Sequence, residues 1–126
     1  MPTKTAMPTK TFTITTQIPL ESVKDLIVSA FEGGSNYWYY DLRPDTKRTT
    51  IRFWHAELPF RKGRAVYLKD SEGDEHKLDL AAIQRGLNIM SEKYPRHMSD
   101  LVAENYDRDT ADVLLQCAVL CEVIYG

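Results

Sequence analysis

The stretch T-A-D-V-L-L-Q-C-A-V-L-C-E-V-I, residues 110–124, determines the fold class of this 126-residue chain. From residue 113 onward, apolar side chains fall on nearly every face of a helix, interrupted by Gln116 and Glu122. A helix that is apolar all round is a buried helix. We therefore expect this segment to be the central core element. Just before it, D-T-A-D (residues 109–112) resembles a capping box in which Asp replaces the usual Glu.

Polar residues and cysteines inside this apolar helix raise separate expectations. A buried carboxylate needs a partner, so Glu122 either meets an arginine from a sheet or lies at a partly exposed helix end, and Gln116 poses the same question. Cys117 and Cys121 are four residues apart, which makes them neighbours on one helix face. We expect two buried free thiols in a reducing compartment rather than a disulfide framework.

The segments before this helix predict a hairpin followed by helices. Residues 64–69 and 75–80 flank D-S-E-G-D (70–74), which has the composition of a hairpin connection. Asp79 can cap a helix whose apolar residues are in register up to Met90. A proline at position 95 ends or follows that helix, and a short helix is expected over residues 99–105 with Ser99 as its cap.

The first half of the chain predicts a strand, a helix and more strands. F-T-I-T-T (residues 12–16) alternates apolar and polar residues, as does 49–55. Between them, Pro19 begins a helix that has one apolar stripe up to Phe31. The two glycines at positions 33 and 34 end this helix. Residues 37–42 are expected to be extended, followed by a turn over 43–45.

These elements define a single α+β domain over residues 11–126, preceded by a disordered segment over residues 1–10. The expected architecture is an antiparallel sheet of four to five strands, with three to four helices packed on one side and the C-terminal helix buried. Hydrophobic content of 43% and charged content of 27% are ordinary for a soluble globular protein. No apolar run has the roughly 20 residues of a membrane span, and no signal-peptide core is visible, which favours a cytoplasmic location.

The strongest binding-site candidate is the stretch E-G-G-S-N-Y-W-Y-Y-D, residues 32–41. Four aromatic residues in a row cannot all face one core, because side chains of a strand alternate between its faces. At least two of them are therefore expected to face solvent, a ligand or a partner. The alternative is that Tyr37 and Tyr39 pack in the core while Trp38 and Tyr40 cover an edge.

A cluster of basic residues follows this aromatic stretch. Between Arg43 and Lys69 the chain carries a net charge of +6, although the whole chain is at −2. Arginine side chains suit phosphates, and aromatic faces stack on bases. If the cluster and the rings share one surface, an anionic, base-containing molecule could bind there; the alternative is a solvated face with unrelated charges. The predicted ligand-binding residues are Ser35, Asn36, Tyr37, Trp38, Tyr39, Tyr40, Arg43, Arg48 and Arg52.

Motifs for catalysis or metal binding are weak. His55-Ala56-Glu57 matches the His-x-Glu of zinc deaminases, but the Pro-Cys-x-x-Cys block that completes their zinc site is missing. The three histidines share no ligand spacing, so neither a metal nor another cofactor is expected. The carboxylates between Asp100 and Asp112 are explained by helix caps and surface positions, or by docking of a basic partner.

Two motifs resemble those of a family of small, functionally uncharacterised proteins of tailed phages and prophages. They are A-F-E-G-G-S-N-Y-W-Y (residues 30–39) and T-A-D-V-L-L-Q (110–116) with its ending E-V-I-Y-G (122–126). The resemblance covers roughly residues 12–126 and brings no catalytic residues with it. It implies an accessory protein that counters host defences, by capping a defence protein or by sequestering a nucleotide second messenger.

Three functions from different classes are therefore expected. The first is a non-enzymatic binding protein that sequesters an anionic, nucleotide-like ligand through the aromatic stretch and nearby arginines. The second is a protein–protein inhibitor or assembly factor whose aromatics are interface anchors, with a host defence protein as the partner. The third is a small hydrolase that uses His55 or Glu57 as its base. Exposed aromatics also favour a homo-oligomer.

Overall fold

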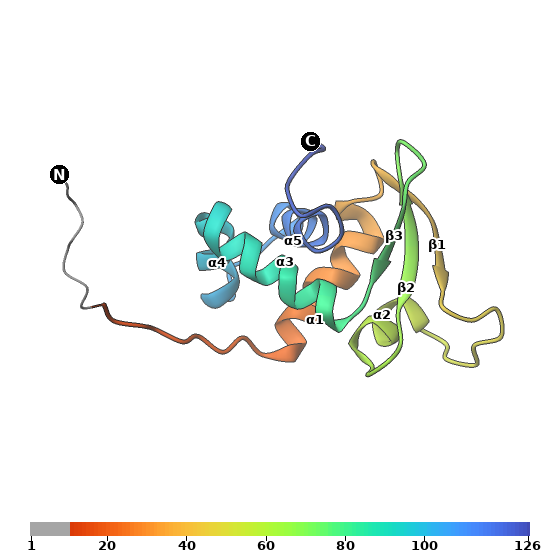
Figure 1. Ribbon diagram of the computed structural model, residues 1–126, viewed down its shortest axis with the longest axis horizontal. Helices are drawn as coiled ribbons and strands as arrows, with labels where there is room; N and C mark the ends of the chain where they lie inside the picture. The colour runs from red at the N-terminus through yellow and green to blue at the C-terminus, as the bar shows by residue number, and fades with distance from the viewer. Residues whose placement is uncertain (1–10) are drawn as a thin grey trace.

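The computed structural model describes residues 11–126, so the disorder expected for residues 1–10 lies outside the described residues. The described chain is an α+β fold with a three-stranded antiparallel sheet in the order β1-β2-β3 (Figure 1). The predicted class is confirmed, whereas the described residues form fewer strands than the predicted four to five and more helices than the predicted three to four. No helix among residues 11–126 is long and apolar enough to cross a membrane.

Five α-helices accompany the sheet, and the element bounds are as follows. The helices are α1 (Leu20–Ser29), α2 (Trp54–Glu57), α3 (Leu80–Lys93), α4 (Pro95–Val102) and α5 (Arg108–Leu120). The strands are β1 (Tyr39–Pro44), β2 (Val66–Asp70) and β3 (Glu75–Leu78). A π-helical turn, η2 (Ala30–Gly34), continues α1, and a 3₁₀ turn, η3 (Leu58–Phe60), continues α2.

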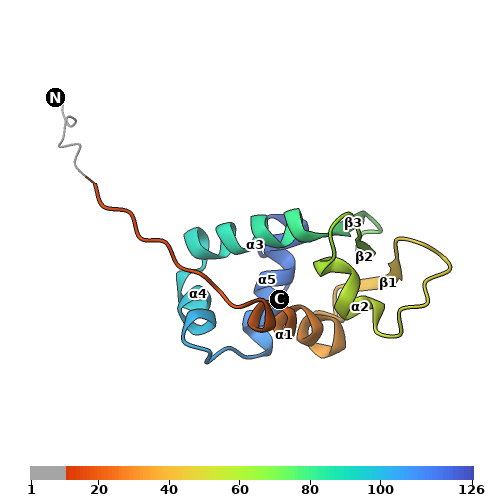
Figure 2. The same cartoon turned by 90° about the horizontal axis from the view of Figure 1, so that it is seen from below.

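Helix α5 is the central core element, as its sequence predicts. All of its residues from Leu114 to Val119 are buried. Figures 1 and 2 show α1 and α3 on either side of it. At the crossing with α3, a Cβ at Gly86 would lie 2.8 Å from the Ala118 Cα, so only glycine allows this close approach of the two backbones. Close packing of this kind fixes the position of α5 relative to α3.

The ends of α5 differ from the prediction. Its capping box is formed by Asp107, which accepts a hydrogen bond from the Thr110 backbone at 3.0 Å, so the box predicted at residues 109–112 is wrong. The helix stops at Cys121, whose φ of 66° is left-handed. Because the chain turns away there, Cys121 is exposed while Cys117 is buried, and both are free thiols. Glu122 is exposed as well and needs no arginine partner.

Two predicted strands are not strands. Residues 12–16 are extended, but no strand within residues 11–126 pairs with them, and a β-pattern forms a ladder only with a neighbour. Residues 49–53 form a loop, and residues 54 and 55 are the first two of α2. The Thr49 hydroxyl accepts a hydrogen bond from the Ile51 backbone at 3.1 Å, a local turn that replaces the ladder. The short helix expected at residues 99–105 begins earlier, at Pro95.

Most other predicted elements are confirmed, but the turn predicted over residues 43–45 is wrong at Arg43 and Pro44, which continue β1. Helix α1 follows Pro19 and buries the predicted stripe, including Val23, Leu26 and Ile27. The hairpin of β2 and β3 flanks the predicted connection, and Asp79 caps α3 by accepting a hydrogen bond from the Ala82 backbone at 2.9 Å. Strand β1 pairs with β2 in a register that shifts between Tyr40 and Arg43.

Candidate functional site

The aromatic segment (residues 35–40) links η2 to β1 and is held by one carboxylate of α5. Asp112 Oδ1 accepts hydrogen bonds from the Ser35 hydroxyl at 2.7 Å and from the Trp38 indole N–H at 2.8 Å. Its Oδ2 accepts one from the Tyr37 hydroxyl at 2.5 Å. Together with the Gln116 amide, this carboxylate receives four side-chain donors, which fix the direction in which the chain leaves the helix and enters the sheet.

Gln116, one helical turn after Asp112, ties the C-terminal residues to the same place. Its amide nitrogen donates to Asp112 Oδ2 and to the Tyr125 carbonyl, each at 3.1 Å. Its amide oxygen accepts from the backbone N–H groups of Ile124 and Tyr125 at 2.8 and 2.9 Å. The Tyr125 ring in turn stacks on Trp38, with centroids 5.5 Å apart and planes 5° from parallel. A buried amide with both ends satisfied is stable inside an apolar helix.

Two of the predicted ligand-binding residues are therefore structural. Ser35 and Trp38 are fully buried, and their polar atoms already serve Asp112. Tyr39 is half-buried; its ring packs edge-on against Phe31, and its hydroxyl donates to the Phe31 carbonyl at 2.5 Å. The expectation that Trp38 walls a ligand is wrong, because its ring fills the space between α5 and the C-terminal residues.

The remaining residues of the aromatic segment reach the surface. Tyr37 is 55% exposed and Tyr40 is 50% exposed, so at least two aromatics do face solvent, as predicted. Asn36 is exposed too. Burial, together with the nearby Asp112 carboxylate, raises the pKa of Tyr37 to about 12. The hydroxyl is thus a neutral donor that already has an acceptor, and the exposed ring edge is what a partner could contact.

Arg43 is a strand residue whose charge is largely balanced. Its guanidinium forms an ion pair with Glu75 on β3, and its Nε lies 3.8 Å from a carboxylate oxygen of Asp41. The same group lies over the Tyr67 ring, 5.6 Å from the centroid. Because these neighbours satisfy the guanidinium, Arg43 is a sheet-stabilising residue more than an open anion site.

Arg48 and Arg52 lie on the loop of residues 45–53, here called the basic loop, which projects from the body after β1 (Figures 1 and 2). The aromatic segment runs into the first two residues of β1, and the basic loop begins after the last one, so the two lie toward opposite ends of the strand (Figure 1). From its first to its last residue the strand spans roughly 17 Å, which is five steps of 3.3 Å. The structure therefore does not bring the rings and these two arginines together into the single site that the sequence predicts.

A partly buried ion pair fixes the start of the basic loop. Asp45 accepts two hydrogen bonds from the Arg64 guanidinium, both at 2.9 Å, and one from the Ala65 backbone at 3.0 Å. The hydrogen bonds from Arg64, followed by the one from Ala65, hold the pKa of the Asp45 carboxyl below its usual value, although burial opposes them. The one acid of the loop is thus neutralised, while its cations are not.

The titratable pairs elsewhere are separate from one another. His55 lies 3.1 Å from Glu32, His76 lies 2.8 Å from Asp70, and His97 lies 3.2 Å from the Thr110 hydroxyl. Lys24 binds Glu57 at 2.7 Å, and that hydrogen bond lowers the pKa of the Glu57 carboxyl. Among residues 11–126, no three His, Cys, Asp or Glu side chains gather as metal ligands would.

Sequence reasoning missed Asp112 and Phe53. Asp112 was assigned to a helix cap, yet it lies one turn inside α5, and its spacing of four residues from Gln116 was the available signal. The alternating pattern of residues 49–55 predicts that Phe53 and Arg52 lie on opposite sides of a strand; instead Phe53 is 58% exposed and the Arg52 guanidinium lies over its ring at 5.3 Å. No local pattern distinguishes that loop from a strand.

In comparisons with known proteins, no family model, no curated protein and no solved structure matches this chain. The resemblance to phage proteins therefore stays a prediction.

Proposed function

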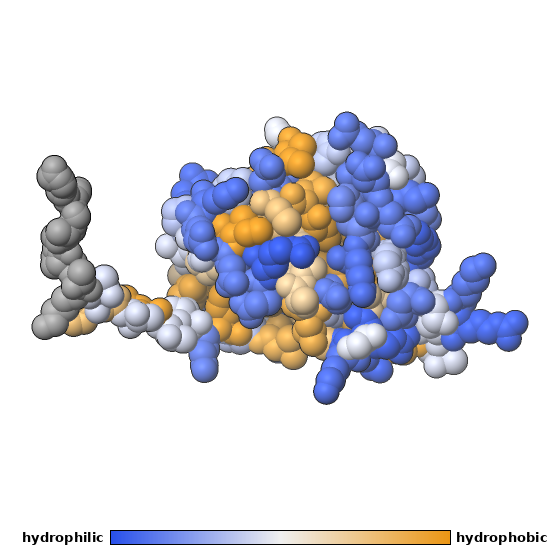
Figure 3. All heavy atoms as spheres, in the orientation of Figure 1, coloured by the Kyte–Doolittle hydropathy of each residue, from blue (hydrophilic) through white to orange (hydrophobic). Residues whose placement is uncertain are grey.

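We propose that this protein acts by binding, and that the basic loop docks on an acidic surface of a partner protein. The observation that carries the proposal is a group of exposed cations without counter-charges. Lys47, Arg48 and Arg52 are exposed, and none has a carboxylate within ion-pair distance among residues 11–126. In Figure 3, hydrophilic side chains project where this loop leaves the body.

The composition of the loop supports a protein partner. Arg52 and Phe53 form an exposed cation–aromatic pair, and arginine and large aromatics carry much of the binding energy at protein interfaces. Both ends of the loop are fixed, by Asp45 with Arg64 and by the packing of α2 on α1 through Lys24 and Glu57. Fixed ends lower the entropy lost on binding. The resemblance to phage proteins makes a host defence protein the partner that we propose.

The test is affinity purification of the tagged full chain from the lysate of a host of the related phages. The double variant Arg48→Glu/Arg52→Glu should lose the captured protein, because two attractive charges become repulsive. The matched control is Arg96→Glu, which reverses an exposed cation on α4, far from the loop in sequence, and should keep the protein. Capture should also weaken as salt rises, since exposed charges are screened.

A nucleotide-like ligand is the competing outcome. Thermal unfolding with a panel of nucleotides measures it directly, because a ligand at 100 times its dissociation constant stabilises by about 2.7 kcal/mol. A nucleotide shift that the double variant loses would replace docking by sequestration of an anionic small molecule. Capture that is unchanged in the double variant would also overturn the role of the basic loop.

A further inference from the structure

The residues before α1 form an extended segment that has no hydrogen-bonded partner. This N-terminal arm, residues 11–19, runs along and away from the helical body (Figures 1 and 2). Within residues 11–126, no backbone N–H or C=O of residues 11–18 takes part in a backbone hydrogen bond. Its sequence nevertheless alternates like a strand, with Phe12, Ile14 and Ile18 at a spacing of two or four.

The apolar side chains of the arm lack cover. Phe12 and Ile14 are each 90% exposed, whereas Ile18 is half-buried against the core. An exposed, uncharged segment with unpaired backbone groups is a template for pairing with another strand. The chain therefore carries a strand sequence whose partner is not one of its own described strands.

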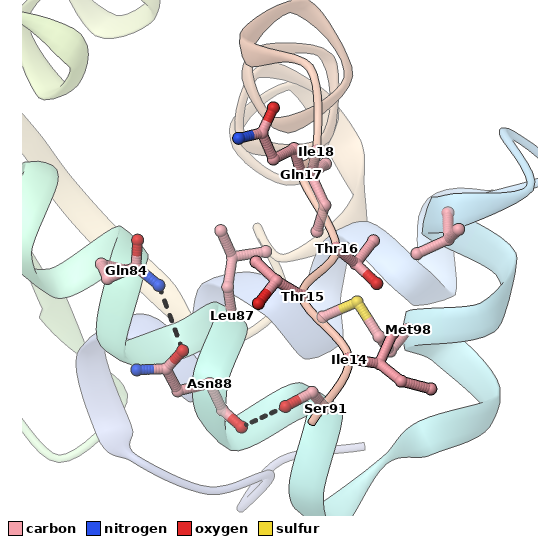
Figure 4. A pocket seen from close by; sticks show the side chains of 11 residues that line it. Ile14, Thr15, Thr16, Gln17, Ile18, Gln84, Leu87, Asn88, Ser91 and Met98 are labelled. Carbon is pink, nitrogen blue, oxygen red and sulfur yellow. Dashed lines mark hydrogen bonds between the residues drawn. The ribbon is translucent and has the colours of Figure 1, made fainter. Parts of the chain in front are cut away.

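A groove lies between the arm and the helices. Its volume is about 720 Å³, and α3 and α4 form its other wall. Figure 4 shows Leu87, Asn88 and Ser91 of α3 and Met98 of α4 around the arm. On α4, Val102 is 51% exposed at the edge of this groove. The apolar part of this wall is thus only partly covered by the arm of the same chain.

The charge of this region favours a second copy of the chain as the occupant. Every side chain that lines the groove is uncharged, and so is every residue of the arm. Two copies of this surface can therefore meet without like-charge repulsion, as they must in a two-fold interface, which brings the same patch of both chains together. The acidic partner proposed for the basic loop would meet no cationic side chain among the residues that line this groove.

We propose that two copies exchange their arms, which pair antiparallel and place Phe12 and Ile14 over the α3–α4 grooves. Pairing satisfies, on both arms at once, the backbone groups that face the partner strand. In a ladder, the period of two puts residues 12, 14, 16 and 18 on the groove side and Thr13, Thr15 and Gln17 on the solvent side. Two Phe12 rings alone contribute roughly 300–500 Å² of the 1,200 Å² or more that a specific interface buries.

The test is the molar mass of the full-length chain in solution over a dilution series, measured by sedimentation or light scattering. We expect a dimer that dissociates on dilution and that changes little with salt. Ile14→Asp in the arm and Val102→Arg in the groove should each weaken association by about tenfold or more. Thr13→Asp is the matched control on the opposite side of the arm and should keep the dimer. Circular dichroism checks that every variant is folded.

Three outcomes would overturn the proposal. The chain could stay monomeric up to its solubility limit, with an arm that resists proteolysis because it closes its own groove. It could be a monomer whose arm is cut at once. It could also be a dimer that both Ile14→Asp and Val102→Arg leave intact, which would place the contact elsewhere. None of these results depends on the partner of the basic loop.

Discussion

Asp112 shows how one residue can organise a site that the sequence assigned to binding. Its carboxylate accepts from three buried donors, the Ser35 hydroxyl, the Trp38 indole and the Gln116 amide, and from the more exposed Tyr37. Ser35 and Trp38 donate to no other acceptor among the described hydrogen bonds, so the position of the aromatic segment depends on this carboxylate. The carboxylate therefore stabilises the fold by the free energy that leaving those donors unpaired would cost.

We therefore expect Asp112→Ala to lower the free energy of unfolding by about 3 kcal/mol, since each buried unpaired donor costs 1–3 kcal/mol. Urea unfolding at neutral pH measures the loss. Asp112→Asn keeps an acceptor oxygen and should lose less than the alanine variant. Glu92→Ala removes an exposed carboxylate on α3 that forms no ion pair within residues 11–126, and should change stability by less than about 0.5 kcal/mol. A loss below that level for Asp112→Ala would contradict the structural role.

At the scale of elements, the junction of β1, the basic loop and β2 depends on an ion pair. Asp45 is the first residue after β1, and Arg64 lies two residues before the start of β2. The bidentate geometry at 2.9 Å favours the ionised carboxylate, which lowers the pKa of Asp45 below its ordinary value of 3.8. A lowered pKa in the folded state contributes stability above the unfolded value, and that contribution is lost as the pH falls through the folded value.

Asp45→Asn should therefore cost about 2 kcal/mol at neutral pH, the worth of hydrogen bonds to a charged group. The difference between this variant and the natural chain should shrink as the pH falls below 3.8. Urea midpoints at a series of pH values give the comparison. Asp41→Asn is the control, because Asp41 is exposed and its cations lie 3.6 and 3.8 Å away. A constant difference at all pH values would show that Asp45 acts through shape and not charge.

The elements also show where sequence reasoning succeeds. The apolar period of α1 and of α3, the hairpin connection and the apolar α5 are local patterns, and each gave the right element. The strand patterns at 12–16 and 49–55 failed, since a strand also needs a neighbour that the local sequence does not specify. The prediction of the binding site failed for a related reason. Whether Trp38 faces inward depends on Asp112, which is 74 residues away.

At the scale of the whole molecule, the Trp38 ring connects the parts of the fold. Its indole N–H donates a hydrogen bond to Asp112 of α5, and its ring stacks on Tyr125 near the C-terminus. Strand β1 begins at the next residue of the chain. The basic loop and the N-terminal arm both project from the packed helices and sheet, so each can reach a partner outside the core (Figure 1). A residue that joins the helices to the sheet should make them unfold together.

Trp54→Phe leaves Trp38 as the only tryptophan, because the chain has two. In this variant we expect the fluorescence of Trp38 and the far-ultraviolet circular dichroism of the helices to change at the same urea concentration. The slope should be about 1–3 kcal/mol per molar urea, as for other small cooperative domains. The dichroism midpoint must match that of the natural chain, which controls for the substitution. Should the Trp38 signal change at a lower urea concentration than the helices, the sheet and the aromatic segment would unfold as a unit of their own, and Asp112 would not couple them to α5.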